Sequence, residues 1–238
     1  MIALRSFADE DLPEGSVVDG NALTKDVEGS FDFVVVGSGA AGAVAAHTLA
    51  TAGFSVAIVE EGAWMKTKDF TNSVADTFQH MLREEGAQAI EGRSFIPLIQ
   101  GRVVGGSTVV NSAIAWRTPD DVFDDWKARF GLGDVVSAKL LEPHFDALER
   151  ELHVTPVADA VLGQNNARFL NEAKSRGWEA EPMKRYDNGC KGSGRCLQGC
   201  PNGAKQGMNI TYVPWTLATG RGRIYTSCRV LKAIVKGG

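Results

Sequence analysis

The sequence lacks a strong excess of charge of either sign. Its 238 residues include 25 Lys and Arg and 29 Asp and Glu, for a net charge of −4. Such a balance gives no general attraction to nucleic acid or to an anionic membrane surface. Four cysteines are too few for a disulfide scaffold in a chain of this length.

Long hydrophobic segments are also scarce. The first 15 residues carry early acids and no apolar centre, and glycines interrupt the most apolar stretch, which lies within residues 33–59. We therefore expect neither a secretory signal nor a membrane span, and we expect a cytoplasmic protein. A hydrophobic content of 44% is ordinary for a soluble protein that buries a core.

Residues 31–61 predict a strand, a glycine-rich turn, a helix and a second strand. An apolar run at 33–36 leads into the sequence GSGAAG at 37–42, and small residues follow as far as 52. A second apolar run at 56–59 ends at Glu60. This order is typical of a dinucleotide-binding βαβ unit, and the alternative is a generic βαβ crossover.

Each part of this unit has a physical role. Gly37 permits a tight turn, Gly39 lets a pyrophosphate approach the backbone, and Gly42 lets the helix pack close to the sheet. The helix N-terminus offers unpaired N–H groups to phosphate. Glu60 follows the last glycine at the distance where a carboxylate accepts both hydroxyls of an adenosine ribose. The predicted cofactor-binding residues here are Gly37, Ser38, Gly39, Ala40, Ala41, Gly42, Glu60 and Glu61.

A second glycine loop, GRVVGGST, occupies residues 101–108 within the stretch 94–116. By itself it is as typical of a tight turn as of a ligand loop. Because it follows a nucleotide-binding unit in the sequence, it favours a second loop whose backbone contacts the same cofactor. Arg102 could bind a phosphate, and Asn111 could hydrogen-bond a ring or a ribose.

Elsewhere the pattern predicts helices at 74–85, 120–150 and 165–176. Strands are expected at 178–186, 210–215, 224–225 and 230–235. Four aspartates at 120, 121, 124 and 125 suit the start of a solvated helix better than a metal site.

Three segments resemble the glucose–methanol–choline (GMC) family of FAD-dependent oxidoreductases. They are VVVGSGAAGAVAA…VAIVEEG, GRVVGGSTVVNSAIAWRTPDDVFDDW, and CPNGAKQGMNITYVPWTLATGRGRIYTSCRVLKAIV. Thr108 replaces the Ser that is commoner in the family's first signature. The resemblance implies that the loop region 94–126 lies along FAD and that the Val230 backbone meets the adenine. It adds these cofactor-binding residues: Arg102, Val104, Gly105, Gly106, Ser107, Asn111, Ser112, Ala113 and Val230.

The implied fold is α/β, with a Rossmann-like FAD-binding core and part of a substrate region. We expect a lead-in segment at 1–30 and an FAD-binding domain at 31–150. A helix and a cysteine- and glycine-rich insertion follow at 151–209, and returning strands of the FAD-binding domain at 210–238.

Members of this family are about twice as long, and their later half supplies the catalytic His and most of the substrate site. The resemblance assigns no catalytic role to His47, His80, His144 or His153, so we expect no catalytic residue here. The chain could belong to an enzyme split between two polypeptides, be a truncated or processed piece, or be a degenerate nucleotide-binding domain. We favour the split enzyme, in which a second polypeptide completes the fold.

Cys190, Cys196 and Cys200 have the spacing C-x5-C-x3-C, and Pro201 follows at once. This pattern is typical of iron–sulfur loops. The same spacing in multi-subunit sugar dehydrogenases of the family implies a possible [3Fe–4S] cluster. Zinc is disfavoured because it takes C-x2-C pairs and a fourth ligand. A disulfide and reduced thiols stay open, and Cys228 is expected to be a small buried hydrophobe in a strand.

The resemblance implies an FAD-dependent alcohol dehydrogenase or oxidase that transfers a hydride from a CH–OH donor to FAD and is active with a partner chain. A first alternative is an NAD(P)-binding dehydrogenase, against which the second glycine loop argues. The others are a non-catalytic FAD- or nucleotide-binding or electron-transfer scaffold, and a GMC-type lyase.

Overall fold

The computed structural model describes residues 12–235, which form two compact units. Unit 1 comprises residues 12–112, Ser193–Gly203 and residues 207–235, and unit 2 comprises Ala113–Gly192 and Ala204–Gln206. The helices of residues 120–151, which the sequence placed with the FAD-binding domain, belong to unit 2. Residues 1–11 of the predicted lead-in segment lie outside the described part.

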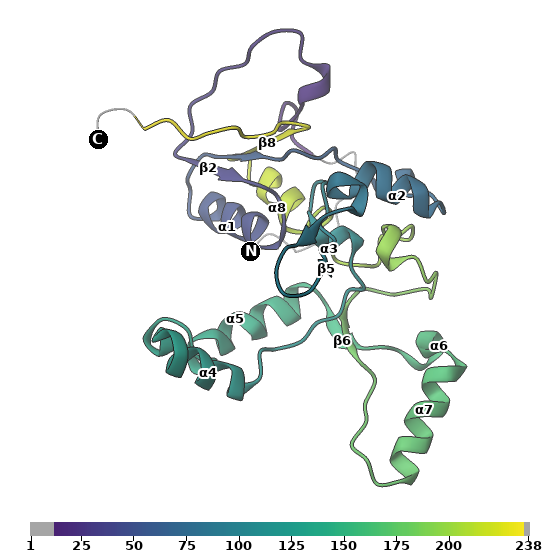
Figure 1. Cartoon of the computed structure of the whole chain (residues 1–238). Helices are drawn as coiled ribbons and strands as arrows, with labels where there is room; N and C mark the ends of the chain where they lie inside the picture. Colours follow the sequence, from purple (N-terminus) through teal and green to yellow (C-terminus); the bar gives the residue numbers. More distant parts are fainter. Residues whose placement is uncertain (1–11, 236–238) are drawn as a thin grey trace. The chain divides into compact units, whose positions relative to one another are not determined.

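A four-stranded parallel sheet organises unit 1 (Figure 1). Its order is β1 (Val17–Asp19), β8 (Gly222–Thr226), β3 (Val56–Val59) and β2 (Phe33–Val36). Strands β2 and β3 pair in register from Phe33 opposite Val56 to Val36 opposite Val59. The predicted α/β fold is therefore confirmed, and the lead-in segment adds a short edge strand that sequence patterns did not reveal.

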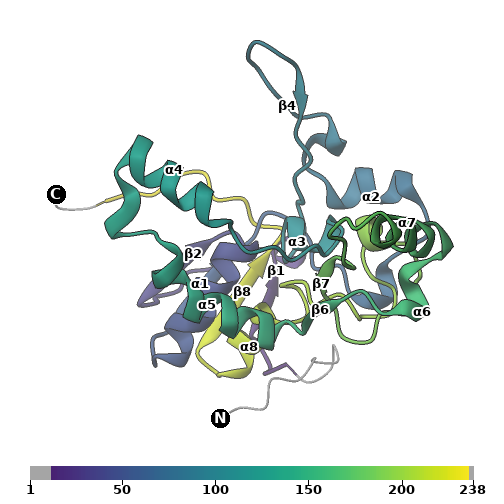
Figure 2. The same cartoon turned by 90° about the horizontal axis from the view of Figure 1, so that it is seen from below.

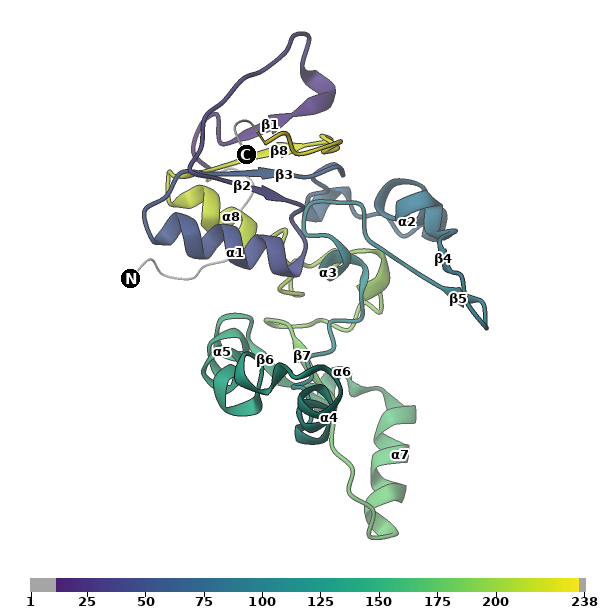
Figure 3. The same cartoon turned by 60° about the vertical axis from the view of Figure 1, so that its left-hand side comes forward.

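Helices α1 (Ala40–Thr51) and α8 (Tyr212–Ala218) cover one face of this sheet (Figure 3). Ala43, Ala46 and Ala50 are the buried residues of α1, and their spacing places them on one side of the helix. Small side chains let α1 approach the sheet closely. Along β3, Val56 and Ile58 are fully buried, as expected for an inner strand of a parallel sheet.

The rest of unit 1 surrounds the second glycine loop. It contains α2 (Val74–Met81), the hairpin strands β4 (Ala89–Ile90) and β5 (Ile96–Pro97), and the four-residue helix α3 (Ser107–Val110). Figure 2 shows the tip of the hairpin projecting away from α2. Short 3₁₀ turns lie at Gly20–Ala22, Thr67–Asp69, Arg83–Gly86 and Cys196–Gln198.

Unit 2 is mainly helical. It contains α4 (Asp120–Phe130), α5 (Ala138–Glu151), α6 (Asp159–Leu162) and α7 (Gln164–Ser175), with a 3₁₀ turn at Leu132–Asp134. Strands β6 (Val154–Pro156) and β7 (Lys184–Tyr186) form an antiparallel pair. Arg117 forms ion pairs with two acids in the C-terminal part of α5. Its Nη2 atom lies 2.6 Å from Asp146 Oδ1 and 2.7 Å from Glu149 Oε2.

Two strand predictions are wrong. Residues 210–215 enter helix α8, in which Tyr212 to Leu217 are all buried. A short apolar run of this kind does not distinguish a buried helix from a strand. Residues 230–235 belong to no helix or strand within the described chain. None of the helices within residues 12–235 has the length and apolar character that a membrane crossing requires.

Candidate cofactor site

The first glycine loop joins β2 to α1, and its three glycines have three different surroundings. Gly37 has φ +89°, which favours glycine, and its N–H donates to the Val59 carbonyl at 2.9 Å. A Cβ on Gly42 would lie 2.1 Å from the Gly37 carbonyl oxygen, so helix and loop are in close contact. A Cβ on Gly39 would meet nothing within 4 Å. The predicted turn and close packing are confirmed, and the open side of Gly39 fits the approach of a pyrophosphate.

Helix α1 presents its N-terminus at this loop. Its N-cap is Gly39, and no side chain caps the first turn. The first N–H groups of the helix therefore keep their capacity to bind an anion, with the partial positive charge of the helix dipole behind them. No acid in the first turn competes for them.

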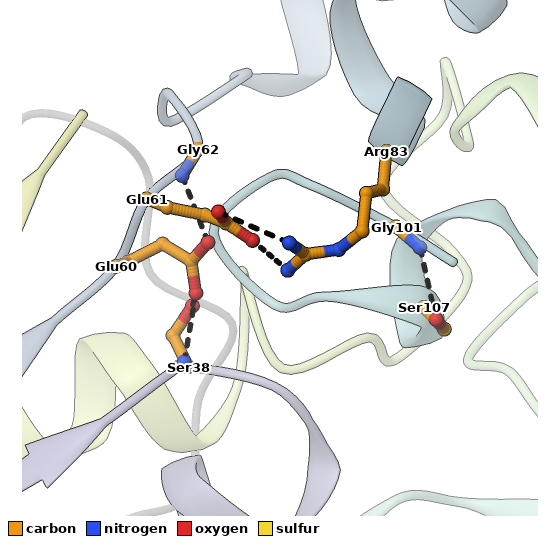
Figure 4. Close-up of polar contacts among 7 residues, drawn as sticks. All are labelled: Ser38, Glu60, Glu61, Gly62, Arg83, Gly101 and Ser107. Carbon is orange, nitrogen blue, oxygen red and sulfur yellow. Dashed lines mark hydrogen bonds and ion pairs between the residues drawn. The ribbon is translucent and has the colours of Figure 1, made fainter. Parts of the chain in front are cut away.

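Glu60 lies at the end of β3 and is buried, with 5% of its surface exposed. Its Oε2 atom accepts hydrogen bonds from the Ser38 amide at 2.8 Å and the Ser38 hydroxyl at 2.7 Å. Its Oε1 atom accepts a bond from the Gly62 amide at 2.9 Å (Figure 4). These donors fix the carboxylate at the mouth of the first glycine loop.

The second glycine loop packs directly against the first. The Gly105 amide donates to the Ser38 hydroxyl at 3.0 Å. A Cβ on Gly106 would lie 2.9 Å from the Gly39 Cα, and one on Gly62 would lie 2.4 Å from the Arg102 backbone. Two loops that are far apart in the sequence thus form one continuous backbone surface. Such a surface is what the prediction of one cofactor bound by both loops requires.

Two hydroxyls fix the shape of the second loop. Ser107 Oγ accepts from the Gly101 amide at 3.0 Å and closes the loop (Figure 4). Thr108 Oγ1 donates to the Gly105 carbonyl at 2.6 Å and accepts from the Met208 amide at 3.0 Å. Thr108, which stands where the family more commonly has Ser, therefore keeps the hydroxyl that forms these two bonds.

Other predicted residues lie in different settings. Glu61 forms an ion pair with Arg83, which occupies its carboxylate (Figure 4). Arg102 is exposed, Val104 is fully buried behind the loop, and Asn111 follows α3 as its C-cap. Ser112 is exposed at the end of the first segment of unit 1, whereas Ala113 belongs to unit 2.

The segment after β8 lies beside Glu60. The amides of Ser227 and Cys228 donate to the carbonyls of Gly62 and Glu60 at 2.9 and 2.8 Å. Val230, the predicted adenine contact, follows two residues later and is 39% exposed. Cys228 is half-buried just beyond β8, and its burial raises the pKa of the thiol, as does the charge of Asp19.

The cysteine segment is divided between the units. Cys190 belongs to unit 2, and Cys196 and Cys200 belong to unit 1. Within residues 12–235, no three His, Cys, Asp or Glu side chains are grouped so that they could hold a metal ion. The iron–sulfur cluster at these three cysteines stays a prediction, because its ligands belong to two units that are described separately.

The histidines have surface or packing roles. His47 contacts the rings of Tyr212 and Trp215, with centroids 5.5 and 6.0 Å away. His80, His144 and His153 are exposed. None of the four lies in either glycine loop.

Comparison with known proteins agrees with this geometry. The family model described as GMC oxidoreductase matches residues 31–238. The chain belongs to the GMC oxidoreductase family. An uncharacterized GMC-type oxidoreductase of Mycobacterium tuberculosis is 39% identical over 208 residues, which cover 87% of this chain and 33% of that protein. Another from Sinorhizobium fredii is 32% identical and covers 92% of this chain and 43% of that protein.

A long-chain-alcohol oxidase of Arabidopsis thaliana is 26% identical over 86% of this chain and 26% of its own length. Among solved structures, pyridoxine 4-oxidase from Mesorbium loti shares the fold with a TM-score of 0.56 at 19% identity, over 87% of this chain and 44% of that one. The chain thus spans less than half the length of these relatives. FAD is the cofactor of this family, and the two joined glycine loops fit it.

Sequence reasoning named the loops but missed the contacts between them. Gly62 and Arg83 were not predicted, although the glycine directly after the acid pair was a visible signal. No local pattern indicated that Ser38 would bond both Glu60 and the second loop, because that contact depends on how distant segments fold together.

Proposed function

We propose that this chain is the FAD-binding part of a GMC-type oxidoreductase that oxidises an alcohol and that a second polypeptide completes. The observation that carries the proposal is the junction of the two glycine loops, where Gly106 approaches Gly39 and Gly105 bonds Ser38. When bound, FAD accepts the hydride of the CH–OH group. The chain's residues bind and orient the cofactor and exclude water from one side of it.

Exposed apolar residues of the sheet support the proposal of a further polypeptide. The loop of residues 20–32 passes over the face opposite α1 and α8 (Figure 3). A cavity of about 620 Å³ is lined by residues of this loop and by Val34, Ala57 and Val59. Val34 and Val36 of the edge strand β2 are 60% and 65% exposed. Parallel sheets are stable when both faces are covered, so this apolar face calls for a cover.

The choice of an alcohol as substrate rests on relatives and on chemistry. A long-chain-alcohol oxidase is among the matching proteins. Oxidation of an alcohol by hydride transfer requires a base for the hydroxyl proton. The resemblance places the catalytic His in the later half of the family's sequence, which this chain does not span, so we assign the base to the partner chain.

Flavin bleaching tests this function. The chain is loaded with FAD, alone and as the complex purified with its partner, and the flavin absorption is followed without oxygen after addition of benzyl alcohol or 1-dodecanol. Bleaching by either alcohol in the complex, and none with the chain alone, is expected. Bleaching with the chain alone would contradict the need for a partner. Flavin that neither alcohol reduces in the complex would contradict the alcohol oxidation and favour a scaffold or a lyase.

A further inference from the structure

Ser38 occupies the centre of the loop junction. Its side chain is fully buried. The hydroxyl accepts from the Gly105 amide at 3.0 Å and lies 2.7 Å from Glu60 Oε2. An amide N–H can only donate, so the hydroxyl must receive that bond and direct its own proton to the carboxylate. The direction of both hydrogen bonds is therefore fixed by the backbone of the second loop.

This arrangement makes the two oxygens of Glu60 unequal. Oε2 accepts two bonds from Ser38, through the amide and the hydroxyl, and Oε1 accepts one from the Gly62 amide. Each carboxylate oxygen has two lone-pair positions. Within the described residues, Oε2 is thus filled, whereas Oε1 keeps one position for a ligand.

We propose that Ser38 is a positioning residue for the adenosine ribose of FAD. Its hydroxyl, held by Gly105, binds Oε2 of Glu60 and leaves Oε1 as the oxygen that accepts from one ribose hydroxyl. The sequence predicted that Glu60 binds both ribose hydroxyls, whereas this arrangement leaves room for only one of them. It also makes ribose recognition depend on the second glycine loop, because loss of the Gly105 bond would free the Ser38 hydroxyl to rotate. The inference rests on the proposed FAD site.

Two nucleotides that differ in the ribose alone test the inference without any turnover. ADP and 2′,3′-dideoxy-ADP compete with FAD for the purified chain, and the ratio of their dissociation constants reports the contribution of the ribose hydroxyls. One hydrogen bond to a carboxylate predicts that ADP binds about 10-fold more tightly in the wild type. In Ser38→Ala the ratio is expected to fall, because Glu60 loses its side-chain donor and its link to the second loop and keeps only the two backbone amides, which hold Oε1 less firmly towards the ribose.

Thr108→Val is the matched control. It also removes a hydroxyl that bonds Gly105, but this hydroxyl donates to the Gly105 carbonyl and accepts from the Met208 amide. The three donors to Glu60, from Ser38 and Gly62, stay in place. The variant is expected to lower stability while it keeps the nucleotide ratio of the wild type. If Ser38→Ala does not fold, Ser38→Cys replaces it, since a thiol is a weaker donor and acceptor, and the ratio is again expected to fall.

The possible outcomes distinguish a failure of the positioning role of Ser38 from a failure of the proposed function. An equal loss of affinity for both nucleotides in the Ser38 variant, with the ratio unchanged, would overturn the positioning role. A ratio of one in the wild type, with FAD still bound, would also overturn it and leave the FAD site intact. Failure of the wild-type chain to bind FAD would instead contradict the proposed function.

Discussion

The hydroxyl oxygen of Ser38 lies 3.0 Å from the amide nitrogen of Gly105, although 67 positions separate the two residues in the chain. The same hydroxyl bonds Glu60, so the first loop, the second loop and the buried acid form one hydrogen-bonded unit. Changes that separate the loops are therefore expected to weaken cofactor binding before they unfold the protein.

Gly42→Ala is expected to destabilise unit 1. The new Cβ would lie 2.1 Å from the Gly37 carbonyl oxygen, which is backbone and cannot rotate away. Overpacking of this kind costs about 1–3 kcal/mol of unfolding free energy. Chemical denaturation monitored by circular dichroism measures the change, and an unaltered midpoint would contradict the close helix–loop packing.

Gly106→Ala is expected to reduce both stability and FAD affinity. Its Cβ would lie 2.9 Å from the Gly39 Cα, and its backbone has φ +56°. Gly131→Ala is the control, because that residue has φ +66° but open space around its Cβ. The Gly131 variant is expected to lose about 1–2 kcal/mol from left-handed strain. The Gly106 variant is expected to lose more, because its ψ of −145° lies in a region that is essentially restricted to glycine. A titration of FAD fluorescence should show weaker binding for the Gly106 variant, while equal affinities in the two variants would argue against one cofactor bound by both loops.

The ion pair of Arg117 and Glu149 should make the stability of unit 2 depend on pH. Two guanidinium bonds at 2.7 Å lower the pKa of Glu149 from its ordinary value of 4.5. The stabilisation is therefore present above pH 4.5 and is lost as the pH falls through the lowered pKa. Glu149→Gln should flatten this part of the curve of melting temperature against pH.

Arg129→Gln provides the control for that measurement. It breaks an exposed pair with Asp125, which is expected to contribute little. If the Glu149 and Arg129 variants have the same pH dependence as the wild type, the pair at Arg117 does not contribute to acid stability.

Cys228 should react slowly with iodoacetamide. Burial and the charge of Asp19 raise the pKa of its thiol above the ordinary value of 9.0. At pH 8.5 the folded chain then holds less thiolate at Cys228 than the urea-unfolded chain, and the difference shrinks as the pH rises. Peptide mass spectrometry measures the rate, and Asp19→Asn, which keeps an acceptor for the Asn21 amide, should increase it. Equal rates in folded and unfolded chains would refute the shift.

The βαβ unit could be predicted because several sequence patterns indicate the same structure. Apolar runs at β2 and β3, alanines at helical spacing and a glycine turn all favour one structure, and the structure has strands at Phe33–Val36 and Val56–Val59 with a helix between them. The amphipathic helix α7 was predicted for the same reason.

Other elements depend on contacts that no local pattern contains. Val213 and Ile210 suggested a strand, yet the segment is helical where Tyr212 and Trp215 pack on His47 of α1. Strand β1 has three residues and exists because Val17 pairs with Ile224. The bond between Ser38 and Gly105 likewise follows from the folded arrangement.

The most direct test is a titration of the wild-type chain and of Gly39→Ala with FAD. A Cβ at residue 39 meets nothing within 4 Å, so the variant should keep its stability to within about 1 kcal/mol. That Cβ would occupy the open side of the loop where the pyrophosphate approaches. We predict that the wild type binds one FAD and that the variant binds it at least about 10-fold more weakly. Equal FAD affinity in both proteins would contradict the cofactor site described by the two loops.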